Sequence, residues 1–343
     1  MLWRRKFTNT AVVYFLLVVV LLVGSYRALR SPSPASPITQ DGPDFWEWDT
    51  NTRFNNDNAV RNGKKHSLCD AFPADVLSQI QVVLKIGSSE PSDRIDTQIS
   101  TVTQCIPNIL IVSDQDSELH GHHVHDVLES LPESFRNNTP EFEAHDAIAQ
   151  GQPPDAVDDR LGWNLDRFKF LPMVEKAYRV SPSAKWFVFL ESDTYFVWDN
   201  LFRLLDKFDP WTPWYMGSPS PGRHTKNDEV TWFAYGGAGF VLSIGALEKL
   251  FAQSFWSSKA SLSEQYEELV KTDNCGDSVL GWVLHEKGVK LTGLWPMFNA
   301  HALNGVPFGP HWCQPVISLH KTLLPDMEGL VKWENQRGWK VCQ

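Results

Sequence analysis

Three short apolar runs in the middle of the chain predict buried strands. They cover residues 81–86, 109–112 and 185–190, and the first two end in turn-forming residues. Between these two, apolar residues recur at helical spacing from Ile95 to Ile106, behind Ser92-Asp93 as an N-cap and before Pro107 as a stop. Strand, helix and strand with short links form a right-handed parallel unit. We therefore predict a parallel sheet that binds ligands at its carboxyl edge.

The segment between the second and third runs divides into a loop and a helix. Residues 141–160 are acidic and rich in Pro and Gly, which predicts a mobile loop. Apolar residues from Trp163 to Ala177 then recur at helical spacing, with Pro172 as an expected kink or early break. The third strand would follow this helix and deliver Glu191 and Asp193 to the same carboxyl edge.

The first 66 residues follow a different pattern. Residues 1–6 are basic, residues 7–26 form an apolar run long enough to cross a membrane, and residues 27–66 are rich first in Ser and Pro and then in Asn and Asp. We predict a cytoplasmic tail, an uncleaved signal anchor and a stem, with residues 67–343 as a lumenal domain. The expected location is the Golgi or ER membrane, as a single-pass type II protein. A cleaved signal peptide is the alternative for the apolar run.

Composition and charge narrow the class of protein. The chain is 42% hydrophobic, which is ample for a core, and its formal charge of −10 without a basic stripe argues against binding nucleic acid. A lumenal domain with five cysteines is expected to form disulfides. Cys69 and Cys105 bracket the first strand and helix, so we predict that pair, with two reduced, buried cysteines as the alternative.

Two carboxylates, Glu191 and Asp193, end the third apolar run on either side of Ser192. Residues two apart in an extended segment point the same way, so both side chains can reach one point. They would repel each other unless a cation joined them, and carboxylate and phosphate oxygens suit Mg²⁺ or Mn²⁺. Taken alone, however, the motif is better explained as ordinary turn or helix-capping chemistry.

Four motifs in order resemble glycosyltransferase family 31, the Fringe-like and core-1 galactosyltransferase-like enzymes. FVFLESDTYFVWDNL, which contains the two carboxylates, resembles the family's Asp-x-Asp strand. Three more motifs follow it, namely YGGAGFVLS at 235–243, NCGDSVLGWVLHEKGV at 274–289 and VISLHK at 316–321. With the first two predicted strands, the resemblance spans about 81–333.

The resemblance implies a GT-A fold, an α/β architecture with a mostly parallel, Rossmann-like central sheet flanked by helices. It also implies an inverting transfer from a UDP-sugar that uses Mn²⁺ or Mg²⁺. Glu191, Asp193 and His320 would take the metal positions, and Asp277 would act as the general base. On sequence alone, a buried hydrogen-bonded histidine remains the alternative for His320, and a helix N-cap remains the alternative for Asp277.

The resemblance further assigns residues to the substrates. Residues placed near the donor are Asp114, Asp166, Lys169 and Ser192, and residues of the donor and acceptor loop are Tyr235, Gly236, Gly237 and Gly239. A solvated helix and a tight glycine turn explain most of these positions almost as well. The sequence also departs from the family, because Glu191 and Ser192 replace acids of an Asp-Asp-Asp run and Gly276 stands where an acid often precedes the base.

We therefore expect transfer of a hexose or N-acetylhexosamine to a hydroxyl of a glycan or glycoprotein, with a β1,3 linkage. One rival is a catalytically inactive lumenal glycan-binding or chaperone-like protein on the same fold, and another is a metal-dependent hydrolase. A separate motif, HGHHVH at 120–125, offers imidazoles for zinc. It has no cysteine partner and is expected in a loop, so an exposed polar turn is the preferred interpretation.

Overall fold

The computed structural model describes residues 44–45, 69, 72–150, 162, 164–252, 260–306 and 314–337. The predicted tail, the predicted anchor and most of the predicted stem lie outside these residues, as do Trp163, Cys313 and Cys342. Within the described ranges, no helix has both the length and the apolar character needed to cross a bilayer.

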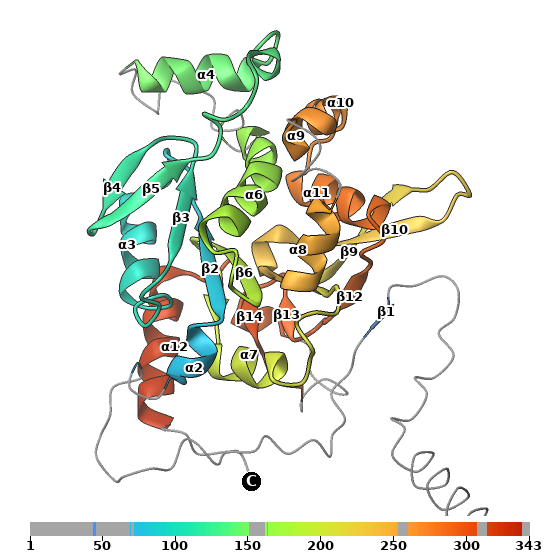
Figure 1. Ribbon diagram of the computed structural model, residues 1–343. Helices are drawn as coiled ribbons and strands as arrows, with labels where there is room; N and C mark the ends of the chain where they lie inside the picture. Colours follow the sequence, from blue (N-terminus) through green and yellow to red (C-terminus); the bar gives the residue numbers. More distant parts are fainter. Residues whose placement is uncertain are drawn as a thin grey trace, which may run out of the picture. The chain divides into compact units, whose positions relative to one another are not determined.

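A mixed nine-stranded sheet forms the centre of the domain (Figure 1). In spatial order its strands are β1 (Asp44–Phe45), β12 (Leu291–Gly293), β8 (Tyr215–Gly217), β11 (Phe240–Ser243), β6 (Trp186–Glu191), β2 (Ile80–Lys85), β3 (Leu110–Ser113), β5 (His122–Asp126) and β4 (Ser117–Leu119). The predicted parallel pairing of the first two strands is confirmed, since β2 lies parallel to both β3 and β6. β11 runs antiparallel to both of its neighbours, and β4 runs antiparallel to β5.

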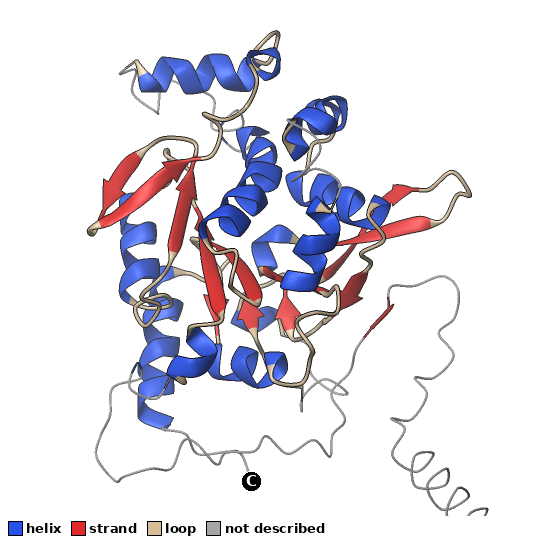
Figure 2. Ribbon diagram, viewed as in Figure 1, coloured by secondary structure: helices blue, strands red, loops and turns tan. Residues whose placement is uncertain are grey.

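Helices cover both faces of this sheet (Figure 2). Alternate residues of β6 point to opposite faces. Phe187 and Phe189 belong to the core that includes residues of α6 (Phe170–Val180), α8 (Ile244–Phe251) and α11 (Gly276–Glu286). Val188 and Leu190 belong to the core that includes residues of α3 (Ser92–Ser100) and α7 (Trp198–Leu205). A strand that is apolar at every position is therefore buried on both sides. The other helices and 3-10 turns are α2 (Ala74–Leu77), η2 (Glu133–Phe135), α4 (Pro140–Ala149), η4 (Asp166–Lys169), η5 (Gly236–Ala238), α9 (Leu262–Gln265), α10 (Glu267–Thr272), η6 (Leu303–Gly305) and α12 (Leu324–Arg337).

Two smaller sheets accompany the large one. β9 (Pro219–His224) and β10 (Val230–Ala234) pair as an antiparallel ribbon. The other small sheet joins β13 (Phe298–Asn299), β14 (Ser318–Leu319) and β7 (Tyr195–Phe196), in that order. Leu319 is in register with Tyr195 across the β14–β7 pair. This pairing brings the late segment of the chain beside the turn that follows β6.

Several predicted boundaries were wrong, each for a local reason. α3 ends at Ser100 instead of continuing to Ile106, because Thr101 leaves helical geometry and both the amide and the hydroxyl of Thr103 donate to the carbonyl of Gln98. Pro172 lies in the first turn of α6, where backbone N–H groups lack helical partners, so it begins the helix rather than breaking it.

The loop predicted for residues 141–160 is a helix, α4, as far as Ala149. Phe142 is buried and packs on Phe168 with ring centroids 5.0 Å apart, so an apolar contact anchors a segment that composition marked as polar. Similarly, Asp44–Phe45 lies in the predicted stem yet pairs with β12 at the edge of the large sheet. Tertiary contacts determine the secondary structure of both segments, and the local sequence pattern shows neither contact.

The predicted disulfide joins Cys69 to Cys105 across a sequence separation of 36 residues. It ties the chain before α2 to the chain after α3. Of the cysteines that the structure describes, Cys275 is free and exposed.

Candidate active site

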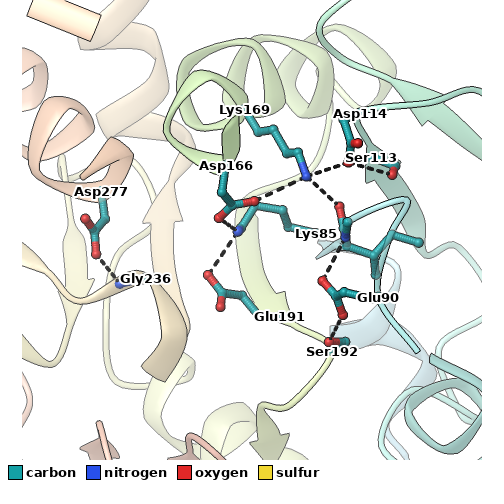
Figure 3. Close-up of polar contacts among 12 residues, drawn as sticks. Lys85, Glu90, Ser113, Asp114, Asp166, Lys169, Glu191, Ser192, Gly236 and Asp277 are labelled. Atoms are coloured by element: carbon teal, nitrogen blue, oxygen red, sulfur yellow. Dashed lines mark hydrogen bonds and ion pairs between the residues drawn. The ribbon is translucent and has the colours of Figure 1, made fainter. Parts of the chain in front are cut away.

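Three strands end together at the candidate site. β2, β3 and β6 are parallel neighbours, with Lys85 in register with Glu191 on one side and with Val112 on the other. The residues that close these strands therefore meet at the carboxyl edge, as predicted. Figure 3 shows their side chains converging there.

The candidate metal ligands Glu191, Asp193 and His320 come together at this edge. Each offers one ligand atom, and these atoms all lie within 4.8 Å of one another. The Nε2 atom of His320 is 3.4 Å from a carboxylate oxygen of Asp193. Residues 127 positions apart in sequence meet because β14, which carries His320 at its end, pairs with β7 just after Asp193.

A turn, and not an extended segment, aims the two carboxylates. Glu191 and Thr194 close this turn, because the amide of Thr194 donates to the carbonyl of Glu191 at 3.1 Å and the amide of Glu191 donates to the hydroxyl of Thr194 at 3.1 Å. The amide of Thr322 donates to the carbonyl of Asp193 at 3.0 Å, which ties the same turn to the His320 segment. The predicted convergence is present, although it arises from a different backbone geometry.

The pKa values of Glu191 and His320 are shifted in opposite directions. Burial raises the pKa of Glu191, the Lys85 ammonium lowers it, and the nearby carboxylates of Asp166 and Asp193 raise it further. Burial lowers the pKa of His320, which favours the neutral imidazole that a metal requires. The Nδ1 atom of His320 lies 3.3 Å from the carbonyl oxygen of Ala300, which can only accept a hydrogen bond. That contact suits the tautomer with its proton on Nδ1, whose Nε2 lone pair could bind a metal.

Two buried lysines neutralise the acids around the candidate metal ligands (Figure 3). The Lys85 ammonium contacts Asp166 and lies 3.2 Å from a carboxylate oxygen of Glu191. Burial alone would lower the pKa of Lys85, but these two carboxylates outweigh burial and raise it well above its usual value. Lys85 is therefore a permanent cation that competes with a metal for Glu191. Sequence reasoning missed it, although a charged residue closing an apolar run was a visible signal.

The ammonium of Lys169 forms ion pairs and a hydrogen bond with groups of the protein itself. It lies 2.7 Å from Asp114 and 3.3 Å from Asp166, and it donates to the carbonyl of Ile86 at 3.1 Å. Asp114 also accepts from the amide of Ser88 at 3.0 Å and from the Ser88 hydroxyl at 2.6 Å. Burial raises the pKa of Asp114, but Lys169 outweighs burial and holds it well below its usual range. In this arrangement Lys169 forms ion pairs with Asp114 and Asp166, two of the residues predicted near the sugar donor. Its own place near the donor stays a prediction.

Replacing Lys169 by Met should lower the free energy of unfolding by about 3–5 kcal/mol, because Asp114 would be left buried without a countercharge. Urea denaturation at neutral pH measures this loss. The matched control is Lys207→Met at a more exposed lysine, for which we expect little change. A loss below about 1 kcal/mol for the Lys169 variant would show that this ion pair does not stabilise the site.

Ser192 and Glu90 form a further polar contact at this edge. The Ser192 hydroxyl donates to a carboxylate oxygen of Glu90, whose other oxygen accepts from the amide of Gly87 at 2.7 Å (Figure 3). Ser192 is buried, so in this arrangement it braces the loop after β2. Its predicted contact with the donor stays a prediction.

Asp277 lies in the first turn of α11 and faces the glycine turn. Cys275 is the N-cap residue of that helix, so the N-cap alternative for Asp277 was wrong. One Asp277 oxygen accepts from the amide of Gly236 at 2.8 Å, and the other accepts from the amide of Ser278 at 2.9 Å. Burial raises the pKa of Asp277, while these two hydrogen bonds lower it. The net increase makes the carboxylate a stronger base than an exposed aspartate.

The glycine turn connects Asp277 to the metal candidates. The amide of Gly236 donates a hydrogen bond to Asp277, and a Cβ atom at Gly237 would overlap the imidazole of His320. Gly239 has a φ of +73°, a left-handed conformation that favours glycine. Tyr235 packs on the same imidazole, with ring centroids 5.3 Å apart. All four residues predicted for the donor and acceptor loop therefore lie in one turn beside the site.

Replacing Gly237 by Ala should displace the His320 ring and reduce metal affinity and turnover together, by about tenfold or more. Calorimetric titration with Mn²⁺ and UDP, together with a steady-state assay, measures both quantities. Gly329→Ala in α12 is the control, since a Cβ atom there meets nothing within 4 Å. Full metal affinity in the Gly237 variant would contradict the packing of this turn on His320.

Comparisons with known proteins find similarity over part of the chain. The family model described as Fringe-like matches residues 166–306, a range that contains Glu191, Asp193 and Asp277 but not His320. The chain is 40% identical over 70 residues to the Fringe glycosyltransferase of Drosophila melanogaster, a match that covers 17% of each chain. It is 32% identical over 132 residues to the beta-1,3-N-acetylglucosaminyltransferase radical fringe of Gallus gallus, covering 35% of this chain and 34% of that one.

These matches are partial. The lunatic fringe enzyme of Danio rerio is 29% identical over 136 residues, and as with the chicken protein the match covers about a third of its length (34%). The solved structure of a glycosyltransferase involved in the glycosylation of the major capsid of PBCV-1 aligns with 74% of this chain and 99% of its own, at 14% identity. Its TM-score of 0.34 is too low to establish a shared fold or activity. Residues 166–306 therefore match the Fringe-like family, and part of the chain is similar to Fringe glycosyltransferases.

Proposed function

We propose that the chain is a metal-dependent, inverting glycosyltransferase with a GT-A fold. It would move a sugar from a UDP-sugar to a hydroxyl of a glycan or glycoprotein. The observation that carries this proposal is the meeting of Glu191, Asp193 and His320 at the carboxyl edge of the sheet. The glycine turn that packs on His320 also donates a hydrogen bond to the base candidate Asp277. The Fringe-like match over residues 166–306 supports it independently.

The three candidate ligands suit one divalent cation. Two carboxylates and a neutral imidazole would hold Mn²⁺ or Mg²⁺, which when bound would offset the negative charge on the departing diphosphate. Burial is the largest cause of the raised pKa of Glu191, the Lys85 ammonium opposes it, and the carboxylates of Asp166 and Asp193 add to it. A bound divalent cation would favour the ionised form of this carboxyl. Lys85 would hold Glu191 in place and would also weaken the affinity for a cation.

The chain's own residues would perform the proton transfer. Asp277 takes the proton of the acceptor hydroxyl as that oxygen forms its bond to the anomeric carbon. The bond from the same carbon to the diphosphate oxygen breaks on the opposite side, and UDP leaves with the bonding pair. Attack opposite the leaving group inverts the anomeric centre, and one base is sufficient for it. The amide of Gly236 holds the Asp277 carboxylate in position for this step.

The sugar and the linkage follow from the relatives as proposals. The matched chicken and zebrafish proteins are named as beta-1,3-N-acetylglucosaminyltransferases. We therefore propose an N-acetylhexosamine or a hexose as the sugar and a β1,3 linkage as the product. A lumenal location in the Golgi or ER, with residues 7–26 as a membrane anchor, is proposed from the apolar pattern of that segment.

A panel of UDP-sugars tests the function. The protein is incubated with each donor and either Mn²⁺ or a chelator, and both UDP and inorganic phosphate are measured. We expect UDP release with one donor class, strongest with UDP-N-acetylglucosamine and lost with chelator. In a parallel incubation with a phosphate monoester, release of inorganic phosphate would indicate the hydrolase instead. A folded protein with neither activity and no affinity for UDP would support the inactive binding protein.

A further inference from the structure

A second cluster of metal-binding side chains lies outside the candidate active site. The motif HGHHVH was expected to form an exposed polar turn, but only His120 and Gly121 form the turn. The following residues form β5 (His122–Asp126), which pairs with β4 on one side and with β3 on the other. Because side chains alternate along a strand, His123 and His125 share one face of the sheet and His122 faces the other.

Asp116 completes this cluster from the short loop between β3 and β4. Asp116, His123 and His125 each offer a ligand atom, and these atoms lie within 4.8 Å of one another. The Nε2 atom of His123 lies 2.9 Å and 3.0 Å from the two carboxylate oxygens of Asp116, and the rings of His123 and His125 are 4.2 Å apart. The amide of Asp126 donates to Asp116 at 3.4 Å. Ligands around a zinc ion lie about 3.3 Å apart, so small rotations would suffice.

Several charged groups lie around the cluster. The hydrogen bond from His123 lowers the pKa of the exposed Asp116 carboxyl. Burial lowers the pKa of His125, and the positive charges of Lys176 and His123 lower it further, while Asp116 raises it. Lys176, from α6, is the one group among these that opposes a bound cation.

We propose that Asp116, His123 and His125 bind one zinc ion. Two imidazoles select zinc or a similar borderline cation over Mn²⁺ or Mg²⁺, which prefer an oxygen-rich set. Three protein ligands leave a fourth position for water or another ligand. The ion would fasten the loop after β3 to β5, immediately beyond Asp114. This site does not depend on the proposed function, because none of its three residues takes part in sugar transfer.

Calorimetric titration with Zn²⁺ tests the site in a background that lacks an active-site metal ligand, Asp193→Ala. In that background we expect one bound zinc ion. His123→Ala and His125→Ala should each weaken zinc binding by at least about tenfold, since even the loss of an outer-shell partner costs that much. His122→Ala is the matched control, because it removes the adjacent imidazole from the opposite face, and it should bind zinc normally.

Two further measurements distinguish a loss of zinc binding from misfolding of the variants. Zinc should raise the melting temperature of the Asp193→Ala protein and not of its His123→Ala derivative, while the two melt alike in chelator. Lys176→Gln should tighten zinc binding, because it removes the opposing charge. If zinc binding survives both His123→Ala and His125→Ala unchanged, or if His122→Ala weakens it equally, the proposed site is overturned.

Discussion

Asp193→Ala should abolish metal-dependent binding of UDP and reduce turnover below detection. The carboxylate of Asp193 lies 3.4 Å from the Nε2 atom of His320, and its backbone carbonyl accepts a hydrogen bond from the amide of Thr322. Removing it leaves Glu191, which Lys85 already neutralises in part, and one imidazole. We expect the affinity for Mn²⁺ in the presence of UDP to fall at least about 100-fold, measured by calorimetry.

Asp206→Ala is the matched control for this variant. Asp206 is an exposed aspartate whose carboxylate lies 3.8 Å from Lys207, so its loss should change neither binding nor turnover. Unaltered thermal unfolding of the Asp193 variant in chelator would exclude a folding defect. Normal Mn²⁺-dependent UDP binding by Asp193→Ala would show that the ligand assignment is incorrect.

Asp277→Asn should leave UDP binding nearly intact and slow turnover by about 10²- to 10⁴-fold. Asparagine keeps the shape of aspartate and can still accept the hydrogen bond from the amide of Gly236, but it cannot take a proton at neutral pH. The expected signature is therefore a loss in kcat with an unchanged UDP affinity, which a steady-state assay and calorimetry separate. The Asp206→Asn variant serves as its control.

The pH dependence of the unmodified protein provides an independent check on Asp277. Burial raises the pKa of this carboxyl above the usual value for aspartate, and only the ionised form can act as a base. The kcat should therefore fall as the pH drops through that raised pKa, at a higher pH than for an exposed aspartate. Equal losses of UDP binding and of turnover in Asp277→Asn would contradict the role of a base.

The sequence predicted those parts of the fold whose signal is local. The apolar runs that became β2, β3 and β6 are buried on both faces, so their composition alone identified them and their parallel order followed from the link between β2 and β3. The extent of α3, the helix α4 and the pairing of β1 depend on contacts such as that of Phe142 with Phe168. Such contacts are distant in sequence or lie outside the helical pattern.

The candidate site shows the same division. Asp277 and the glycine turn were identified from motifs, and the structure joins them through the Gly236 amide. Pairing of β14 with β7 brings His320 to Asp193, a contact that the resemblance implied and that no local pattern predicts. Lys85 was missed because its role depends on Asp166 and Glu191, which reach it only when β2 and β6 lie side by side.

Glu191 and Ser192, which depart from the family motif, each make a specific contact in this structure. Glu191 reaches one methylene further than aspartate, and it uses that reach to contact Lys85 as well as the metal position. Ser192 replaces a carboxylate with a hydroxyl that bonds Glu90, so one negative charge is absent from a crowded edge. Because Glu191 shares its carboxylate with Lys85, we expect metal binding to depend on Asp193 more than on its neighbours.

The most direct test is a crystal structure of the protein with Mn²⁺ and UDP, with anomalous diffraction recorded at the manganese absorption edge. We predict one strong anomalous peak within coordinating distance of Glu191, Asp193 and His320, with diphosphate oxygens completing its coordination. An ordered UDP with no manganese peak among these three side chains would contradict the account, as would a manganese ion bound elsewhere on the domain.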